Sequence, residues 1–404
     1  MDGKSFDLGA NYITPDYPRT LALAEEMGAE TFVAQGIQTA AIGPDGIQWE
    51  MPPPDDPAVV FAAMTKYLEI RKTLTYLDRP VLTNLPDEVL VTFQEWLAAN
   101  DLSVLEPLFW VPITTMGYGF LDEIPAVYAL KFMSPGTFLP IFLRALPQMQ
   151  GEGEMLERVV PWPKKFVDGF QRLWERVSWQ LDVRLNVTIH EVQRDGQTIR
   201  IDFEQQGRSH SDVVTLRDER SFDALVLACP LDVATDFMKL EPEEAKVFSR
   251  IRFNSYVVSS YSLKAPIEQI HGQAVAFVPP GTLGEPWAIA QVWKGESHLV
   301  QFFNRVDPAR PDEEVFESVR DANLEVLAKI PAEVDEDETW TLDRWPYFQH
   351  YGVQDLRDGV LDDLQNLQGT QATWYAGGGS HFELVESAMD NAHHVVSLLR
   401  ARFS

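Results

Sequence analysis

The sequence predicts an α/β protein in which helices alternate with a large block of antiparallel strands. Apolar residues recur at helical spacing in several segments, and in others they form short runs separated by turn dipeptides. The chain closes with a strand, a glycine turn and a helix. Its 404 residues exceed one small core, so two interleaved domains, or one large domain with insertions, are expected.

The predicted helices each place apolar residues on one stripe. The first ends at Gly28, a residue suited to a helix C-terminus. In chain order the helices cover residues 19–27, 57–77, a segment after Pro86, 166–177, 312–330 and a closing helix to Arg402.

The predicted strands begin with a short one at 6–8. A hairpin at 182–203 turns at Asp195–Gly196, a dipeptide typical of tight hairpin turns. Further strands are expected at 221–228, 255–263, 273–278, 287–293, 298–303, 338–345 and 373–376.

The charge balance excludes some partners. Acidic residues outnumber basic ones 61 to 33, giving a formal net charge of −28, which repels nucleic acid. The single cysteine, Cys229, cannot form an intramolecular disulfide, and no signal peptide or run of 18 apolar residues is present. We therefore expect a soluble, cytoplasmic protein with no transmembrane segment. No metal site is expected, because the eight histidines lack ligand spacing.

The most informative local unit is the closing strand, turn and helix. Three glycines, Gly377 to Gly379, allow the backbone to approach a ligand closely, and the helix behind them offers unpaired N–H groups. Ser380 and Glu383 have the spacing of a capping box at the start of that helix. The unit suits a phosphate, a ribityl chain or a flavin carbonyl. A tight strand-to-helix connection without a ligand is the alternative.

Three segments together resemble the flavin-dependent amine-oxidase superfamily. They are DLGANYITPDYPRTLALAEEMGAE at 7–30, VRLNVTIHEVQRDGQTIRI followed by FDALVLACPL at 183–231, and WYAGGGSHFELVESAMDNAHHVV at 374–396. Their order and spacing also agree with that family. The resemblance implies FAD as the cofactor and an FAD-binding, Rossmann-like domain interleaved with a substrate domain of mixed and antiparallel sheet.

The resemblance also implies positions for the cofactor contacts. The main chain of Gly9, Ala10, Asn11 and Tyr12 would lie along the isoalloxazine, and Ile189 would lie beside the adenine. Cys229 and Pro230 would end a strand near the cofactor, and Gly377 and Gly378 would approach its ribityl and phosphate groups. Leu384 and Val385 would begin the helix whose N–H groups face the flavin pyrimidine, where they stabilise negative charge.

Within the superfamily the sequence looks most similar to flavin-dependent double-bond isomerases of polyunsaturated fatty acids. The segments carrying this likeness are FWVPITTMGYGFLDEIPAVYALKFM at 109–133, FVDGFQRLW at 166–174 and YVVSSYSLKAP at 256–266. Val258 stands where many amine oxidases place a lysine near the flavin N5. Tyr118, Tyr347 and Tyr351 are candidates for the substrate pocket, with a purely structural role as the alternative.

Two features depart from the family. Its C-terminal motif reads Ala-Gly-Glu, but Gly378 stands at the third position here, so one acidic cofactor contact is lost. No GxGxxG follows a strand, so the unit that would hold the pyrophosphate is missing, and a truncated gene model or fragment is the simplest explanation. The incomplete FAD-binding domain would comprise 1–14, 155–245 and 365–404, and the substrate domain 15–154 and 246–364.

Three functions follow as hypotheses. The first is an FAD-dependent oxidoreductase or redox-neutral isomerase acting on a small apolar substrate, unsaturated ones included. The second is a flavin amine oxidase, against which Val258 argues weakly. The third is a truncated, non-catalytic module that binds an apolar ligand. No residue stands out in the sequence as a general base, and the substrate, electron acceptor and oligomeric state are not predicted.

Overall fold

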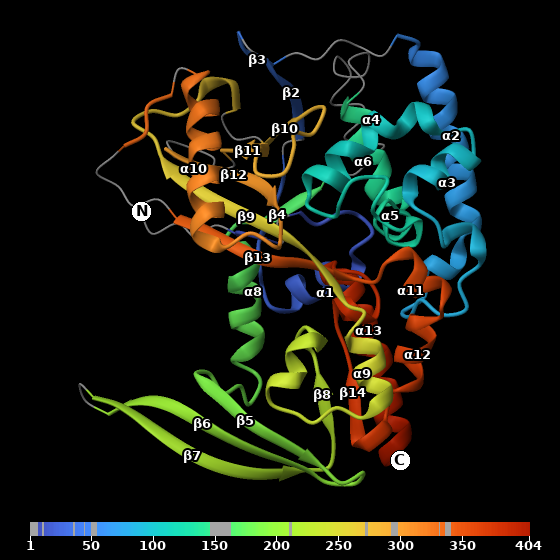
Figure 1. Cartoon of the computed structure of the whole chain (residues 1–404), viewed down its shortest axis with the longest axis vertical. Coiled ribbons are helices and arrows are strands. Elements are labelled where there is room, and N and C mark those ends of the chain that lie inside the picture. The colour runs from blue at the N-terminus through green and yellow to red at the C-terminus, as the bar shows by residue number, and fades with distance from the viewer. Residues whose placement is uncertain are drawn as a thin grey trace.

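The structure confirms the predicted α/β class. It is a computed structural model that describes residues 7–9, 12–34, 37–43, 45–49, 55–145, 163–209, 212–270, 274–291, 298–330, 332–335 and 341–404. A large sheet and a block of helices form the upper part, and a smaller sheet lies at the far end (Figure 1).

The large sheet contains seven of the described strands, in the order β13-β9-β12-β11-β10-β2-β3. Only the pair formed by β10 and β2 is parallel in it, and the other neighbours are antiparallel. The strands are β2 (Ile37–Gly43), β3 (Gly46–Gln48), β9 (Arg252–Ser262), β10 (Ala274–Phe277), β11 (Pro286–Ala290), β12 (Leu299–Val306) and β13 (Thr341–His350).

The two faces of this sheet have different roles. Helix α10 (Asp312–Ala328) packs on one face, where Phe277 and Ile289 meet Leu327 in a buried cluster. Side chains alternate along a strand, so the neighbouring residues Ala276 and Ala288 face the other way. That second face, opposite α10 (Figure 1), lies toward the helical block.

The helical block follows β3 and has a core rich in aromatic residues. Asp56 caps the first helix, and Thr92 forms a capping box with Glu95 at the second. The elements are α2 (Pro57–Thr73), α3 (Phe93–Ala99), α4 (Glu106–Phe109), a π-helical turn at Trp110–Thr115, α5 (Ala126–Phe132) and α6 (Pro135–Ala145).

The far end of the molecule holds a three-stranded antiparallel sheet and a two-stranded parallel one. The strands are β5 (Val187–Arg194), β6 (Ile199–Ser209) and β7 (Asp212–Phe222), and the parallel pair β8 (Leu225–Leu227) and β14 (Thr373–Tyr375). The helices near them are α8 (Gly169–Ser178), α9 (Pro242–Phe248), α11 (Val353–Arg357), α12 (Val360–Asn366) and α13 (Val385–Phe403).

A buried ion pair joins three of these elements. The Arg194 guanidinium of β5 contacts both Glu244 carboxylate oxygens of α9, at 2.6 and 2.7 Å. The Tyr375 hydroxyl of β14 donates to the same carboxylate. Burial alone would raise the pKa of Glu244, but hydrogen bonds from Arg194, Tyr375 and the Glu241 N–H lower it. The pair therefore fixes the end of β14, from which the glycine turn departs.

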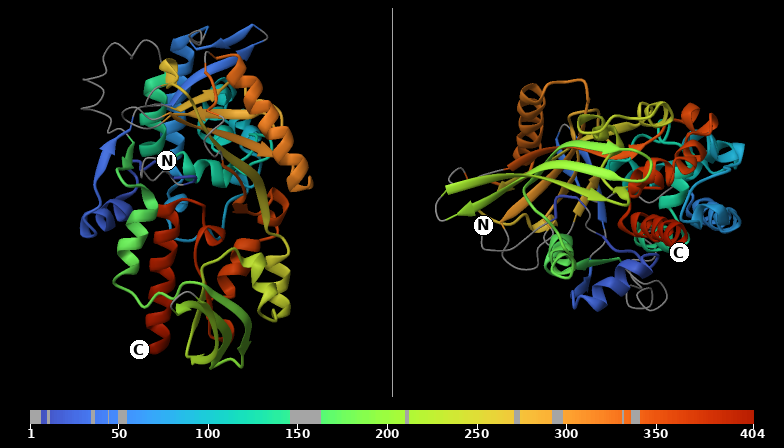
Figure 2. Two further views of the ribbon diagram at one scale, coloured as in Figure 1. Left: turned by 90° about the vertical axis from the view of Figure 1, so that its left-hand side faces the viewer. Right: turned by 90° about the horizontal axis from the view of Figure 1, so that it is seen from below.

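The two ends of the chain meet at α1 (Pro18–Glu26) and α13. Figure 2 shows α1 and α8 beside the start of α13. The remaining strands, β1 (Thr31–Val33) and β4 (Lys164–Phe166), pair with each other in this region. In the described part of the chain, no helix is long and apolar enough to cross a membrane.

Candidate cofactor and substrate cavity

A cavity of about 400 Å³ lies between the large sheet, the helical block and the meeting chain ends. Its lining is mostly apolar and aromatic, as in small-molecule sites generally. The lining residues are Gly9, Tyr12, Thr14, Tyr17, Ile37, Pro112, Thr115, Met116, Tyr118, Phe132, Thr137, Pro140, Pro163, Tyr256, Ala274, Ala288, Ala290, Phe303, Tyr347, Gly378, Glu383, Leu384, Val385 and Ala388.

Residues from opposite ends of the chain form one wall of this cavity: Gly9 and Tyr12 line it together with Leu384 and Val385. Glu386 explains why they converge. Its carboxylate accepts hydrogen bonds from the backbone N–H groups of Arg19 and Thr20, both at 2.9 Å, and so holds the start of α1 against the start of α13.

The glycine turn at 377–379 has a backbone conformation that requires glycine. Gly377 has φ +111° and ψ −166°, a conformation that L residues rarely adopt, and its N–H donates to Asn391 Oδ1 at 3.1 Å. Gly379 packs so closely on Gln349 that a Cβ there would lie 2.2 Å from Nε2. Gly378 brings the backbone of the turn to the cavity wall, where it packs against Glu383 so closely that a Cβ would lie 3.2 Å from the Glu383 Cα.

The predicted capping box at Ser380 and Glu383 is wrong. Ser380 ends a 3₁₀ turn, and α13 begins five residues later at Val385, with Leu384 as its uncapped N-terminal residue. Of the three residues between the turn and Leu384, His381 and Phe382 are buried, so the chain passes through the core before α13 begins. As a result the first N–H groups of α13 have no side-chain cap and lie at the cavity wall.

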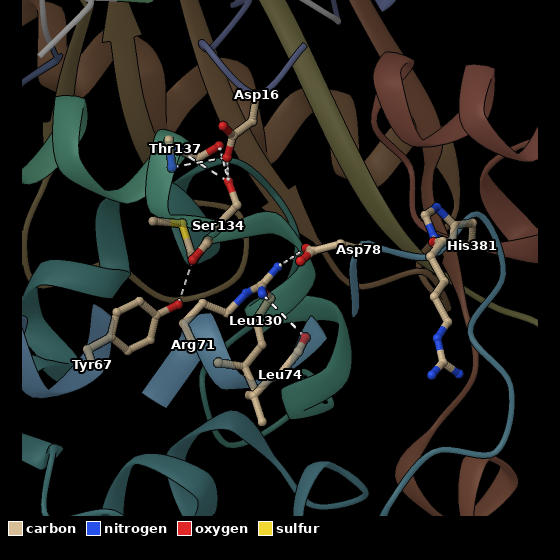
Figure 3. Close-up of polar contacts among 12 residues, drawn as sticks. Asp16, Tyr67, Arg71, Leu74, Asp78, Leu130, Ser134, Thr137 and His381 are labelled. Atoms are coloured by element: carbon tan, nitrogen blue, oxygen red, sulfur yellow. Dashed lines mark hydrogen bonds and ion pairs between the residues drawn. The ribbon is translucent and has the colours of Figure 1, made fainter. Parts of the chain in front are cut away.

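Another wall is held by Asp16 (Figure 3). Its carboxylate accepts from the Gly136 N–H at 3.0 Å and from the Ser134 hydroxyl, at the start of α6. This contact places Thr137 beside Thr14, with their hydroxyl oxygens 3.2 Å apart. Both threonines line the cavity, so its polar atoms on this side are already paired.

Two of the three predicted tyrosines lie in the cavity. Tyr118 and Tyr347 have ring centroids 5.6 Å apart and share a hydrogen bond, and Tyr256 stacks on Tyr347 at 5.4 Å. The Tyr256 hydroxyl donates to the Thr115 carbonyl at 2.6 Å, in the π-helical turn. Burial raises the pKa of Tyr118 and Tyr256, so both stay protonated near neutral pH.

Glu383 is the functional candidate that sequence reasoning missed. Its carboxylate lines the cavity near Tyr118 and Tyr347 and accepts the Gln349 N–H at 2.8 Å. Desolvation raises the pKa of Glu383 to about 7, and hydrogen bonds from the Gln349 and Phe348 N–H groups only partly offset the rise. Its spacing from Ser380 gave it a capping role, and no sequence signal placed it in a pocket.

The other predicted positions lie outside this cavity. Tyr351 is fully buried in the core, where its N–H contacts the Tyr128 hydroxyl at 3.3 Å, because β13 ends at His350. Ile189 is 39 % exposed on β5. Cys229 and the exposed Pro230 follow β8, beside Gly377, and burial raises the pKa of the Cys229 thiol.

Ala10 and Asn11 lie outside the described residues, so their predicted cofactor contacts are not placed. Val258, which the resemblance aligns with a lysine of many amine oxidases, is buried on β9.

The described residues fit the ring end of a flavin. Uncapped N–H groups at Val385, the bare backbone of Gly378 and the aromatic lining supply donors and flat apolar surface in one place. No glycine-rich turn comparable to Gly377–Gly379 follows β8 in the described part, where the chain continues as Ala228, Cys229 and Pro230. The fit therefore covers the flavin ring and does not extend to the dinucleotide end.

Comparisons with known proteins agree with this geometry. The model of the family described as flavin containing amine oxidoreductase matches residues 1–394. No curated protein sequence is similar enough to this chain to count as a match.

Solved structures show the same fold. A CLA-producing fatty acid isomerase from P. acnes superposes with a TM-score of 0.79 at 22 % identity, over 100 % of this chain and 88 % of that one. Putrescine oxidase bound to putrescine gives 0.62 at 12 % identity, covering 99 % and 89 %. Cyclohexylamine oxidase from Brevibacterium oxydans gives 0.56 at 13 %, covering 98 % and 88 %.

Proposed function

The chain belongs to the flavin-containing amine oxidoreductases, and from this premise we propose that it is an FAD-dependent oxidoreductase or redox-neutral isomerase acting on a small apolar substrate. FAD is the cofactor that family membership implies, and it supplies the acceptor for a hydride or its equivalent. The observation that carries the proposal is the apolar cavity, which the chain ends and the large sheet enclose together.

The residues of the chain would act by binding and orientation. Uncapped N–H groups at the start of α13 would stabilise negative charge on the flavin pyrimidine. The sheet face at Ala288, Ala290 and Phe303 would hold an apolar chain and exclude water. A hydride transfer between a carbon and a flavin requires no protein base, which is consistent with the lining.

Spectroscopy tests this proposal directly. We expect the purified full chain, supplied with FAD, to show a flavin absorption spectrum perturbed by the protein. Anaerobic addition of an unsaturated apolar substrate should bleach that spectrum, transiently if the reaction is an isomerisation. A protein that leaves the FAD spectrum unchanged would overturn the enzyme assignment and favour the non-catalytic, apolar-ligand module.

One observation favours a second candidate, a flavin amine oxidase. Glu383 is a buried carboxylate beside the rings of Tyr118 and Tyr347, an arrangement that could receive a substrate ammonium group. Val258, which the resemblance aligns with the lysine that many amine oxidases place near the flavin N5, argues weakly against it. Peroxide release measured with a panel of primary amines decides between the two, since an isomerase acting on apolar chains produces none.

A further inference from the structure

A single carboxyl group faces the apolar cavity, and the main chain beside it holds it there. Apart from tyrosines, Glu383 is the one titratable side chain among the described lining residues. Its Oε2 accepts the Gln349 N–H at 2.8 Å, and the Phe348 N–H also binds the carboxyl. No side chain of the described residues hydrogen-bonds to it. Two N–H groups use only part of what a carboxyl group can bind, so a ligand in the cavity can use the rest.

The end of strand β13 is bent where it meets this carboxyl. The pairing of β13 with β9 is irregular between Tyr347 and His350. Phe348, inside this irregularity, has φ +59°, a left-handed conformation that is uncommon for residues other than glycine. Such a bend can direct successive N–H groups at one acceptor and turn a neighbouring side chain. It therefore accounts for the grip on Glu383 and for the position of Tyr347 in the cavity lining.

The tyrosines near Glu383 supply a second hydrogen-bond donor. Tyr118 of the helical block and Tyr347 of β13 share a hydrogen bond, which uses one hydroxyl hydrogen and leaves the other. Tyr256 of β9 is already engaged, because its hydroxyl donates to the Thr115 carbonyl at 2.6 Å. Burial raises the pKa of all three tyrosines, so their hydroxyls stay protonated near neutral pH.

The charged and titratable groups of the neighbouring elements do not neutralise this carboxyl. His381, two residues before Glu383, is buried, and burial lowers its pKa to about 3, so it stays neutral. Glu386 on α13 binds the start of α1. Lys165 on β4 is a buried cation without a hydrogen-bond partner among the described residues, and its Nζ lies 4.3 Å from the ring centroid of Tyr12. Lys165 does not line the cavity, and it is not a cause of the pKa shift of Glu383.

We propose that Glu383, with the hydroxyl pair of Tyr118 and Tyr347, forms a subsite for the carbonyl oxygen of an uncharged apolar substrate, as in a ketone, an ester or an amide. The protonated carboxyl donates to one lone pair of that oxygen, and the free tyrosine hydroxyl donates to the other. The apolar remainder of the substrate lies along the sheet face at Ala288 and Phe303. This inference rests on the proposed function, because it takes the cavity as the substrate site, and it adds the polar group of the substrate.

Binding of three ten-carbon probes to the full chain, near pH 6 and near pH 8, tests the subsite without any turnover. The probes are 2-decanone, decane and decylamine, which is a cation at both values. Because the pKa of Glu383 is about 7, its protonated fraction falls about tenfold between the two pH values. A ligand that needs the protonated carboxyl loses affinity in proportion. We therefore expect the affinity for 2-decanone, measured by thermal shift and by protein fluorescence, to fall about tenfold, and that for decylammonium to rise.

Two variants separate the hydrogen bond from the change in charge. Glu383→Gln keeps an N–H donor at every pH, so its affinity for 2-decanone should lose the pH dependence and stay near the wild-type value at pH 6. Glu383→Leu removes the donor and should weaken 2-decanone by about tenfold near pH 6, the effect of roughly one hydrogen bond, without weakening decane. Glu317→Gln, on the exposed side of α10, is the matched control and should keep the wild-type pH dependence.

The subsite is disproved if the wild type binds 2-decanone equally tightly near pH 6 and near pH 8, or if Glu383→Gln shows the same pH dependence as the wild type. Tighter binding of decylammonium than of 2-decanone near pH 6 would also overturn it. Absence of any 2-decanone binding has the same consequence.

Repeating the series with saturating FAD gives a separate reading, because a flavin ring also carries carbonyl oxygens. If FAD abolishes the pH-dependent binding of 2-decanone, the two donors belong to the cofactor and the substrate subsite is overturned. If that binding persists while the flavin spectrum stays unperturbed, the subsite stands and the enzyme assignment falls. Flavin bleaching by substrate without any pH-dependent ketone binding gives the reverse result.

Discussion

Replacing Glu383 with glutamine should stabilise the protein, and increasingly so as the pH rises. Burial raises the pKa of Glu383 from 4.5 to about 7, so folding disfavours its ionised form. In the unfolded chain the carboxyl ionises near 4.5, whereas in the folded protein it ionises only near 7. Stability is therefore lost as the pH rises through this window and falls no further above it.

The size of the effect follows from the proton affinities. Each pKa unit corresponds to about 1.4 kcal/mol, and the pKa of Glu383 rises from 4.5 to about 7. The full loss in the free energy of unfolding above pH 7 is therefore about 3 kcal/mol. Glu383→Gln keeps an acceptor for the Gln349 N–H and removes the titrating group. The free energy of unfolding of the variant should exceed that of the wild type by about 3 kcal/mol near pH 8 and by about half of that near pH 5.5.

Urea denaturation at the two pH values measures this difference, with the exposed Glu317→Gln on α10 as the control. Both values stay above the isoelectric point of 4.6, where the protein would be least soluble. If the stability difference between Glu383→Gln and the wild type is the same at both values, the carboxyl does not titrate in this window and the reasoning from desolvation is refuted.

Three further substitutions test the architecture around the cavity. Glu244→Ala leaves the Arg194 guanidinium buried without its partner, and urea denaturation should show a loss of about 3–5 kcal/mol. Gly377→Ala forces an L residue to φ +111°, and the same measurement should show a loss of about 1–3 kcal/mol. Ala288→Leu fills part of the cavity from the sheet, so the thermal shift that decane produces should shrink while the ligand-free melting temperature changes little.

The sequence predicted best those elements whose local pattern agrees with their environment. The parallel strand at Thr373–Tyr375, the glycine turn and α13 are found where their residues placed them. Strands β9 to β12 are equally clear, because their apolar runs are buried on both faces between α10 and the cavity. Their spacing alone identified the sheet that forms the cavity floor.

Other elements depend on contacts that no local pattern reveals. Strand β2 is half-buried beside β10, with only Ala40 fully buried, so it shows no alternation strong enough to predict. Strand β7 is highly charged and was missed because its stability comes from pairing with β6 along its whole length. The meeting of α1 with α13 depends on two carboxylates of α13, Glu386 and Asp390, whose partners Arg19 and Thr20 lie at the other end of the chain.

The residues of the candidate site also fall into two groups, those that the sequence identified and those that only the fold reveals. Tyr118 and Tyr347 were identified by likeness to a family and do line the cavity, whereas Tyr351 follows the end of β13 into the core. Glu383 was not identified, because a buried polar side chain is recognised only once its surroundings are known. Neither residue type nor spacing distinguishes Glu383 from the exposed glutamates of the chain.

The Glu383 carboxyl restricts the substrate more than the apolar walls of the cavity do. Glu383 ionises only near pH 7, so a neutral ligand meets a neutral cavity below that value. An ammonium ligand forms an ion pair with Glu383 only after that carboxyl has lost its proton. Its binding would therefore lower the pKa of Glu383 and release a proton to the solvent. An uncharged ligand needs no such change, because Glu383 is the one Asp, Glu, Lys, Arg or His among the described lining residues. The lower cost of the second arrangement favours an uncharged apolar substrate over an amine.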